Sequence, residues 1–151
     1  MSAHQESTNA PTTSTAPDQP MTPEQIVNEY LRLVMIPEPE QASRYVSDAM
    51  TIHFTGNRLM HRPADCAAFN ASRYKWVKKS IDSTETVAGG TDEHTVVYSL
   101  GTLYGEWPDG TPFEGNRYVD RYIVSHGLIT ELSVWNDSAE RLMVTAGLIE
   151  P

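Results

Sequence analysis

The sequence has little cysteine, little positive charge and no long apolar run. Its single cysteine, Cys66, excludes an intrachain disulfide and fits a reducing compartment, so we expect a cytoplasmic protein. No stretch approaches the roughly 20 apolar residues of a membrane-spanning helix. The N-terminus also lacks the apolar segment of a secretory signal. We therefore expect neither membrane insertion nor secretion.

Acidic residues dominate the charge. The chain has 11 Lys and Arg against 20 Asp and Glu, a net charge of −9, and a pI of about 4.9. Nucleic-acid binding and attachment to anionic membranes both depend on basic patches. The composition thus favours a small-molecule partner over a nucleic acid or a membrane.

The length and composition predict one folded domain behind a tail. Residues 1–20 are rich in Ser, Thr, Pro and Ala and have little apolar surface to offset the entropy lost on ordering. We expect this segment to be disordered and residues 21–151 to form one domain, because 151 residues rarely make two.

The first helix is marked by its own end signals. Thr22 is suited to be the N-cap, Pro23 to be the first helical residue, and Gln25 to complete a capping box. Apolar residues follow at helical spacing until Pro37. Three further helices are predicted, at residues 40–46, 63–77 and 138–146.

The remaining pattern predicts strands. The expected strands are residues 50–55, 80–88, 94–107, 113–124 and 128–137. The last four are joined by short turn-forming segments, which is typical of an antiparallel meander. Helices would cover one face of this sheet, giving an α+β fold.

One strand carries an unusual carboxylate. In the segment NRYVDRYIV, alternation places Asp120 on one face with Asn116, Tyr118, Tyr122 and Val124. A carboxylate buried among tyrosines is costly unless it is paired, hydrogen-bonded or protonated. Asp120 is therefore a candidate site residue, and a structural ion pair with an arginine is the alternative.

The order of elements and the C-terminal hairpin NRYVDRYIVSHGLITELSVWNDSAERLM resemble the nuclear-transport-factor-2-like (NTF2-like) superfamily. The resemblance covers residues 22–143 and is strongest to its SnoaL-like and ketosteroid-isomerase-like branch. It implies a cone-shaped, curved antiparallel sheet with helices packed on the concave face. It also implies a homodimer through the outer face, where Arg117, Val119 and Arg121 would lie.

The resemblance to ketosteroid isomerases implies three catalytic residues. Tyr30 matches their first-helix tyrosine, His53 stands where they have a base aspartate, and Asp120 matches a protonated acid that donates to the substrate oxygen. This set implies cofactor-free acid–base chemistry, as an isomerase or lyase, on a small apolar or aromatic ring-bearing substrate in a catabolic or secondary-metabolite pathway. No cofactor or metal is expected, since the histidines lack ligand spacing.

Two sets of alternatives remain open at this stage. Tyr30 also fits a plain core position, and His53 also fits a wet sheet face. The residues expected to bind the substrate are equally suited to a core or a dimer interface: Tyr118, Trp135, Tyr104, Asn116 and Trp76. The second functional hypothesis is accordingly a non-catalytic domain of the same fold, for small-molecule binding or assembly.

Overall fold

The computed structural model describes residues 19–151. The tail expected at residues 1–20 lies, except for its last two residues, outside the described part. Within residues 19–151, no helix is both long and apolar enough to cross a membrane.

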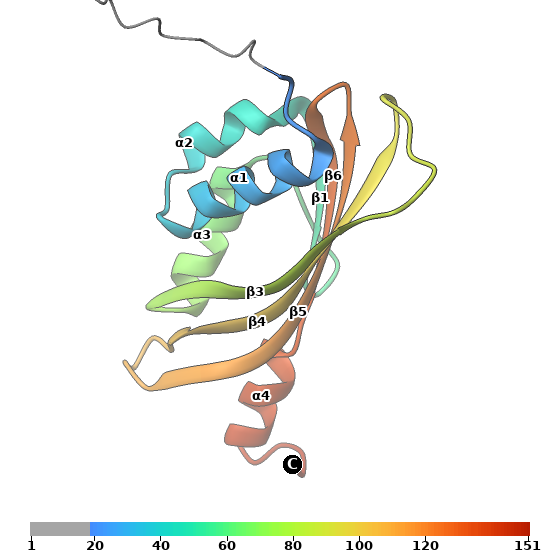
Figure 1. The fold of residues 1–151 in the computed structure, drawn as a ribbon. Helices are drawn as coiled ribbons and strands as arrows, with labels where there is room; N and C mark the ends of the chain where they lie inside the picture. Colours follow the sequence, from blue (N-terminus) through green and yellow to red (C-terminus); the bar gives the residue numbers. More distant parts are fainter. Residues whose placement is uncertain (1–18) are drawn as a thin grey trace, which may run out of the picture.

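Residues 19–151 form four α-helices, a short 3₁₀ helix and one six-stranded sheet (Figure 1). The helices are α1 (Pro23–Met35), α2 (Pro39–Ala42), α3 (Pro63–Arg73) and α4 (Ser138–Thr145). The strands are β1 (Val46–Phe54), β2 (Arg58–Met60), β3 (Trp76–Thr86), β4 (Thr95–Glu106), β5 (Pro112–Ser125) and β6 (Leu128–Asn136). The fold is α+β, as the sequence predicts.

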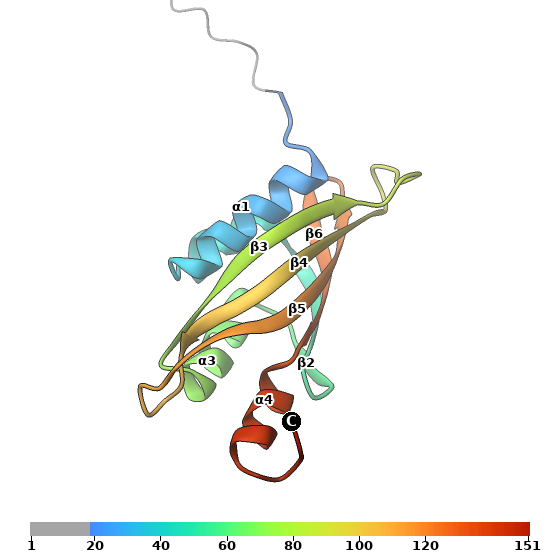
Figure 2. The ribbon, with the colours of Figure 1, turned by 60° about the horizontal axis from the view of Figure 1, so that its bottom comes forward.

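The helices divide into a layer and a separate end piece. Figure 1 shows α1, α2 and α3 on one side of a curved, open sheet, and Figure 2 shows α4 projecting from one end of it. The core lies between the layer and the concave face of the sheet, where α1 contributes Val27 and Leu31, β1 contributes Met50 and Ile52, and β6 contributes Ile129. Helices on the concave face thus agree with the expected architecture.

The sheet order is β2-β1-β6-β5-β4-β3. All neighbours are antiparallel except β1 and β6, which run parallel. The expectation of a wholly antiparallel sheet is wrong at this pair. The two strands come from opposite ends of the domain, so no turn sets their relative direction.

Two expected boundaries are also wrong. Helix α3 ends at Arg73 and β3 begins at Trp76, whereas the sequence analysis extends the helix to Val77. The chain leaves the helix because the N–H of Lys75 already donates to the carbonyl of Glu106 in β4. The helix expected at residues 40–46 is likewise shorter, since β1 begins at Val46 after a 3₁₀ turn.

Candidate functional site

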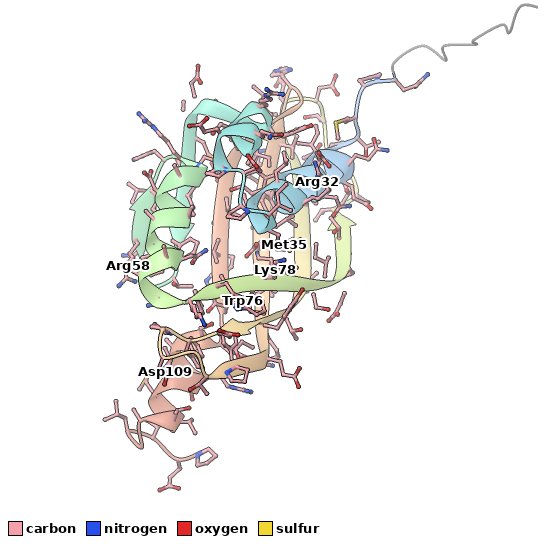
Figure 3. All side chains as sticks on the ribbon, turned by 90° about the vertical axis from the view of Figure 1, so that its left-hand side faces the viewer. Arg32, Met35, Arg58, Trp76, Lys78 and Asp109 are labelled. Atoms are coloured by element: carbon pink, nitrogen blue, oxygen red, sulfur yellow. The ribbon has the colours of Figure 1, made fainter. Side chains whose placement is uncertain are left out.

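A cavity of about 110 Å³ lies between the helix layer and the concave face of the sheet. Its wall is mostly apolar, with polar groups from α1, β3 and β5. The lining includes Tyr30, Leu31, Val34, Phe54, Cys66, Lys79, Leu103, Tyr118, Asp120, Tyr122, Leu132 and Val134. In Figure 3, Met35 and Lys78 lie near each other where the end of α1 meets β3, at one edge of this cavity.

Asp120 is the buried charge of this wall. Its residue is 1% exposed, on the concave face of β5 between Ser99 of β4 and Val134 of β6. Its Oδ2 accepts a hydrogen bond from the Tyr122 hydroxyl at 3.1 Å and forms an ion pair with the ammonium of Lys79. Its Oδ1 is buried and has no hydrogen-bond partner among residues 19–151. A buried acceptor oxygen without a donor among these residues is energetically costly.

Lys79 supplies the positive charge. The side chain is 18% exposed, and its Nζ lies 4.1 Å from the centre of the Tyr118 ring as well as against Asp120. Lys79 pairs with Leu103 of β4, between two glycines that let β3 approach closely. A Cβ at Gly101 or Gly105 would collide with the backbone of β3.

The sequence analysis does not include Lys79 in the site. With the helix extended to Val77, the lysines at positions 75, 78 and 79 look like a solvated helix end. A strand that begins at Trp76 instead puts Val77 and Lys79 on the concave face by alternation. The β-forming residues Tyr74, Trp76 and Val77 were the available signal.

Three tyrosines surround the ion pair. Burial, followed by the nearby charge of Asp120, raises the pKa of Tyr122 well above its usual value. Burial is also the main reason why the pKa of Tyr30 is raised, and it raises the pKa of Tyr118 to about 12. All three phenols are therefore neutral hydrogen-bond donors near neutral pH.

Only one of these phenols is uncommitted. Tyr122 donates to Asp120, and the Tyr118 hydroxyl shares a 2.9 Å hydrogen bond with Ser99. Tyr30 packs edge-on against Tyr122, with ring centres 6.0 Å apart. Its hydroxyl makes no hydrogen bond to another residue of 19–151, and the ring lines the cavity. Tyr30 thus lines the same cavity as Asp120.

His53 does not join them. It is exposed on the opposite face of β1, beside Leu59 and Ser133, while Ile52 and Phe54 face the helices. The assignment of His53 as the base is corrected on this geometry, because a base must come within hydrogen-bond reach of the proton it takes. His53 instead lies on a solvent-exposed face of the sheet, which is the alternative stated in the sequence analysis.

Four of the five expected substrate-binding residues also lie outside the cavity. Trp135, 55% exposed, and Tyr104 are on the outer face of the sheet, and Trp76 packs edge-on against Tyr104 with ring centres 5.9 Å apart. Asn116 is buried, but its amide donates to the Ser138 hydroxyl at 3.2 Å behind the cavity wall. Of the five, only Tyr118 lines the cavity.

The partner of Asp120 differs from the expected one. The resemblance implies an acid that donates to the substrate, and the alternative is an ion pair with an arginine. The structure instead places the ammonium of Lys79 against Oδ2. The site then offers an accepting carboxylate, an ammonium and a phenol. Among residues 19–151, no three His, Cys, Asp or Glu side chains lie close enough to hold a metal ion.

Comparison with solved structures identifies the fold. An NTF2-like protein of Burkholderia thailandensis superposes with a TM-score of 0.66 at 17% identity, covering 85% of this chain and 98% of that one. An NTF2-like protein of unknown function from Burkholderia pseudomallei gives 0.66 at 14%, covering 81% and 96%. The chain has the NTF2-like fold. No family model and no curated protein matches the sequence.

A third structure with the NTF2-like fold was obtained with an organic ligand. TerC, co-crystallised with polyporic acid, superposes with a TM-score of 0.63 at 11% identity, covering 83% of this chain and 99% of TerC. Likeness at such identities defines the fold and leaves the reaction to the site, because one fold hosts many chemistries.

Proposed function

We propose that this chain is a cofactor-free acid–base enzyme, an isomerase or lyase, that moves a proton on a small ring-bearing carbonyl compound. The observation that carries the proposal is the buried carboxylate of Asp120, with Oδ1 unpartnered among residues 19–151, in the wall of an apolar cavity. Such a carboxylate is costly to bury, and a few convergent polar groups in a largely apolar pocket are the usual mark of a binding or active site.

Each polar group has a role in this reaction. Asp120 takes the proton from the carbon next to the carbonyl, with Oδ1 as the accepting atom. The ammonium of Lys79 and the hydroxyl of Tyr30 face the same cavity and stabilise the negative charge that grows on the carbonyl oxygen. The raised pKa of Tyr30 keeps this phenol protonated as a donor.

The cavity size bounds the substrate. Its volume is about 110 Å³, and an apolar cavity of about 150 Å³ holds benzene. Because the cavity is smaller than this reference, a single ring is the largest group that it encloses. Further substituents would have to extend past the edge beside Met35 and Lys78. The co-crystallisation of TerC with an organic acid supports a small organic ligand for this fold.

The test is proton exchange in heavy water. Cyclohexanone is incubated with the protein in D2O, and loss of the α-protons is followed by proton NMR. We expect wild type to accelerate exchange and Asp120→Asn to lower the rate by roughly 100-fold, the low end of what a positioned base contributes. His53→Ala is the matched control, because its side chain is exposed on the other face.

Exchange that is as fast in a folded Asp120→Asn protein as in wild type would refute the proposal. A chain that binds ring ketones, seen as shifted NMR signals, without any exchange would be a binding domain instead. The mostly apolar lining of the cavity is the observation that favours this second function.

A further inference from the structure

We propose that Lys79 is a covalent catalyst that forms an imine with an aldehyde or ketone substrate. The inference rests on the proposed function and deepens it, since it changes Lys79 from a group that stabilises charge on the substrate oxygen to the nucleophile. It starts from the position of the amine, whose Nζ lies inside the wall of the cavity rather than in solvent.

The three lysines of the chain differ in their surroundings. Lys75 and Lys78 are exposed, and Lys75 pairs with Glu106 at the surface. Lys78 also borders the cavity, at its edge, but of the three lysines Lys79 is the one that contacts a buried carboxylate. A lysine in a largely apolar pocket becomes a nucleophile once it is deprotonated, and Asp120 is a group in contact with it that can take the proton.

Asp120 can free the amine. An ammonium is not a nucleophile, so Lys79 must first lose a proton. Removing water from an ion pair raises the free energy of both charged groups. The neutral amine and carboxylic acid then lie closer in energy to the charged pair. A substrate that fills the cavity and displaces water thus promotes proton transfer from Nζ to the carboxylate.

The step balances without an added reagent. The lone pair of Nζ attacks the carbonyl carbon, a C–N bond forms, and the oxygen gains a proton as the nitrogen loses one. The protonated Asp120 then gives its proton to the hydroxyl of this carbinolamine, and water leaves. The products are an iminium on Lys79, a carboxylate on Asp120 and one water molecule.

The iminium makes the neighbouring carbon acidic. Asp120, again a carboxylate, can take a proton from that carbon. Where the substrate carries a hydroxyl on the next carbon, Asp120 can instead take the hydroxyl proton, so that this carbon leaves as a carbonyl compound and the electrons of the broken carbon–carbon bond pass to the iminium as an enamine. Either route suits an isomerase or lyase. The substrate class narrows to aldehydes and ketones, because carboxylic acids and esters do not form imines with an amine in this way.

Reductive trapping tests the inference. Wild type is incubated with cyclohexanone and sodium cyanoborohydride, which reduces an iminium to a stable secondary amine, and the adducts are mapped by peptide mass spectrometry. With only three lysines, each site is scored separately. We expect labelling of Lys79 to exceed that of Lys75 at least tenfold, despite the greater exposure of Lys75.

Two variants complete the experiment. Lys79→Arg keeps the positive charge beside Asp120 but cannot form an imine, so it should lose both the label and α-proton exchange. Lys75→Arg should keep both. Equal labelling of Lys75 and Lys79, or exchange that persists in Lys79→Arg, would overturn the covalent role while leaving acid–base catalysis in place. No label and no exchange in wild type would overturn both.

Discussion

At the scale of single residues, the ion pair between Lys79 and Asp120 contributes little net stability to the fold. Replacing a buried ion pair by apolar residues of similar volume is often neutral or stabilising, whereas removing one partner alone costs roughly 3–5 kcal/mol. Because Lys79 is partly exposed, removing one partner should lower the free energy of unfolding by less than it would in a fully buried pair. A pair that stabilises little, placed at a cavity, fits a chemical role better than a structural one.

The sequence reveals Asp120 and Tyr30 but not their partner. A carboxylate that alternates with tyrosines is visible in any strand, and α1 shows its apolar stripe. Placing Lys79 in the site requires knowing that residues 76–79 form a strand and which of them face the concave side. Both depend on the residue at which β3 begins. The assignment of His53 was wrong for a different reason. The alternation of residues in β1 already put the apolar Ile52 and Phe54 on the face opposite His53, but the resemblance to ketosteroid isomerases was given more weight than this pattern.

The tyrosine phenols predict a loss of stability in alkali. Unfolded tyrosines ionise near pH 10, whereas Tyr118 in the fold keeps its proton until about pH 12. Above pH 10 the unfolded chain therefore loses protons that the folded chain retains. This favours unfolding, so stability should be full below pH 10 and fall between pH 10 and 12.

Urea denaturation at a series of pH values measures this effect. Tyr118→Phe, which removes one of the phenols with a raised pKa, should flatten part of the slope. A free energy of unfolding that stays constant from pH 10 to 12 would contradict the prediction.

At the scale of elements, the residues that cap helices and form turns predicted the structure better than the length of each segment did. Helix α1 has the expected capping box between Thr22 and Gln25. Strand β2, three residues long, was missed because so short a run has no readable period. The turn before it contains Gly56 and Asn57, both with positive φ, which is the chemistry of a tight hairpin and was the available signal.

The close approach of β3 to β4 gives an element-scale prediction. In Gly101→Ala the new methyl group meets the carbonyl oxygen of Ser80, which is backbone and cannot rotate away. We expect a loss of about 1–3 kcal/mol in the free energy of unfolding, measured by urea denaturation. Displaced β3 should also carry Lys79 out of place and slow α-proton exchange.

Thr102→Ala is the matched control for this change. Thr102 is the next residue of β4, on the outer face and half-buried, so its substitution should stay within about 0.5 kcal/mol of wild type. If Gly101→Ala were as stable as Thr102→Ala, the close packing of the two strands would not limit substitution.

At the scale of the whole molecule, the outer face of the sheet carries the expectation of a homodimer. Val119 pairs with Leu100 on one side and Trp135 on the other, which makes an apolar band across β4, β5 and β6. We expect the wild-type chain to sediment as a dimer in analytical ultracentrifugation. Val119→Lys should give monomers, because it places a charge at the centre of the band.

Leu59→Lys serves as the control, since Leu59 is an apolar residue on β2 that is more exposed than Val119 and lies away from the band. It should leave the dimer intact. A monomeric wild type at micromolar concentration would count against this interface.

The topology was only partly predictable. The four-strand meander follows from its turns, because short connections force antiparallel neighbours. The position of β1 does not, since its parallel partner β6 is set by burial of Met50 and Ile52 against α1 rather than by any local signal.

That pairing also has a consequence for synthesis on the ribosome. The last strand to be made, β6, lies in the interior of the sheet between the first strand and β5. Until it emerges, β1 with its hairpin partner cannot join the meander, and both fragments present open strand edges that can pair with other chains. Nascent chains that stall before residue 128 should therefore aggregate or require a chaperone, whereas loss of the residues after α4 should not. Because β6 is translated last, the complete sheet can form only late in synthesis and in a single step.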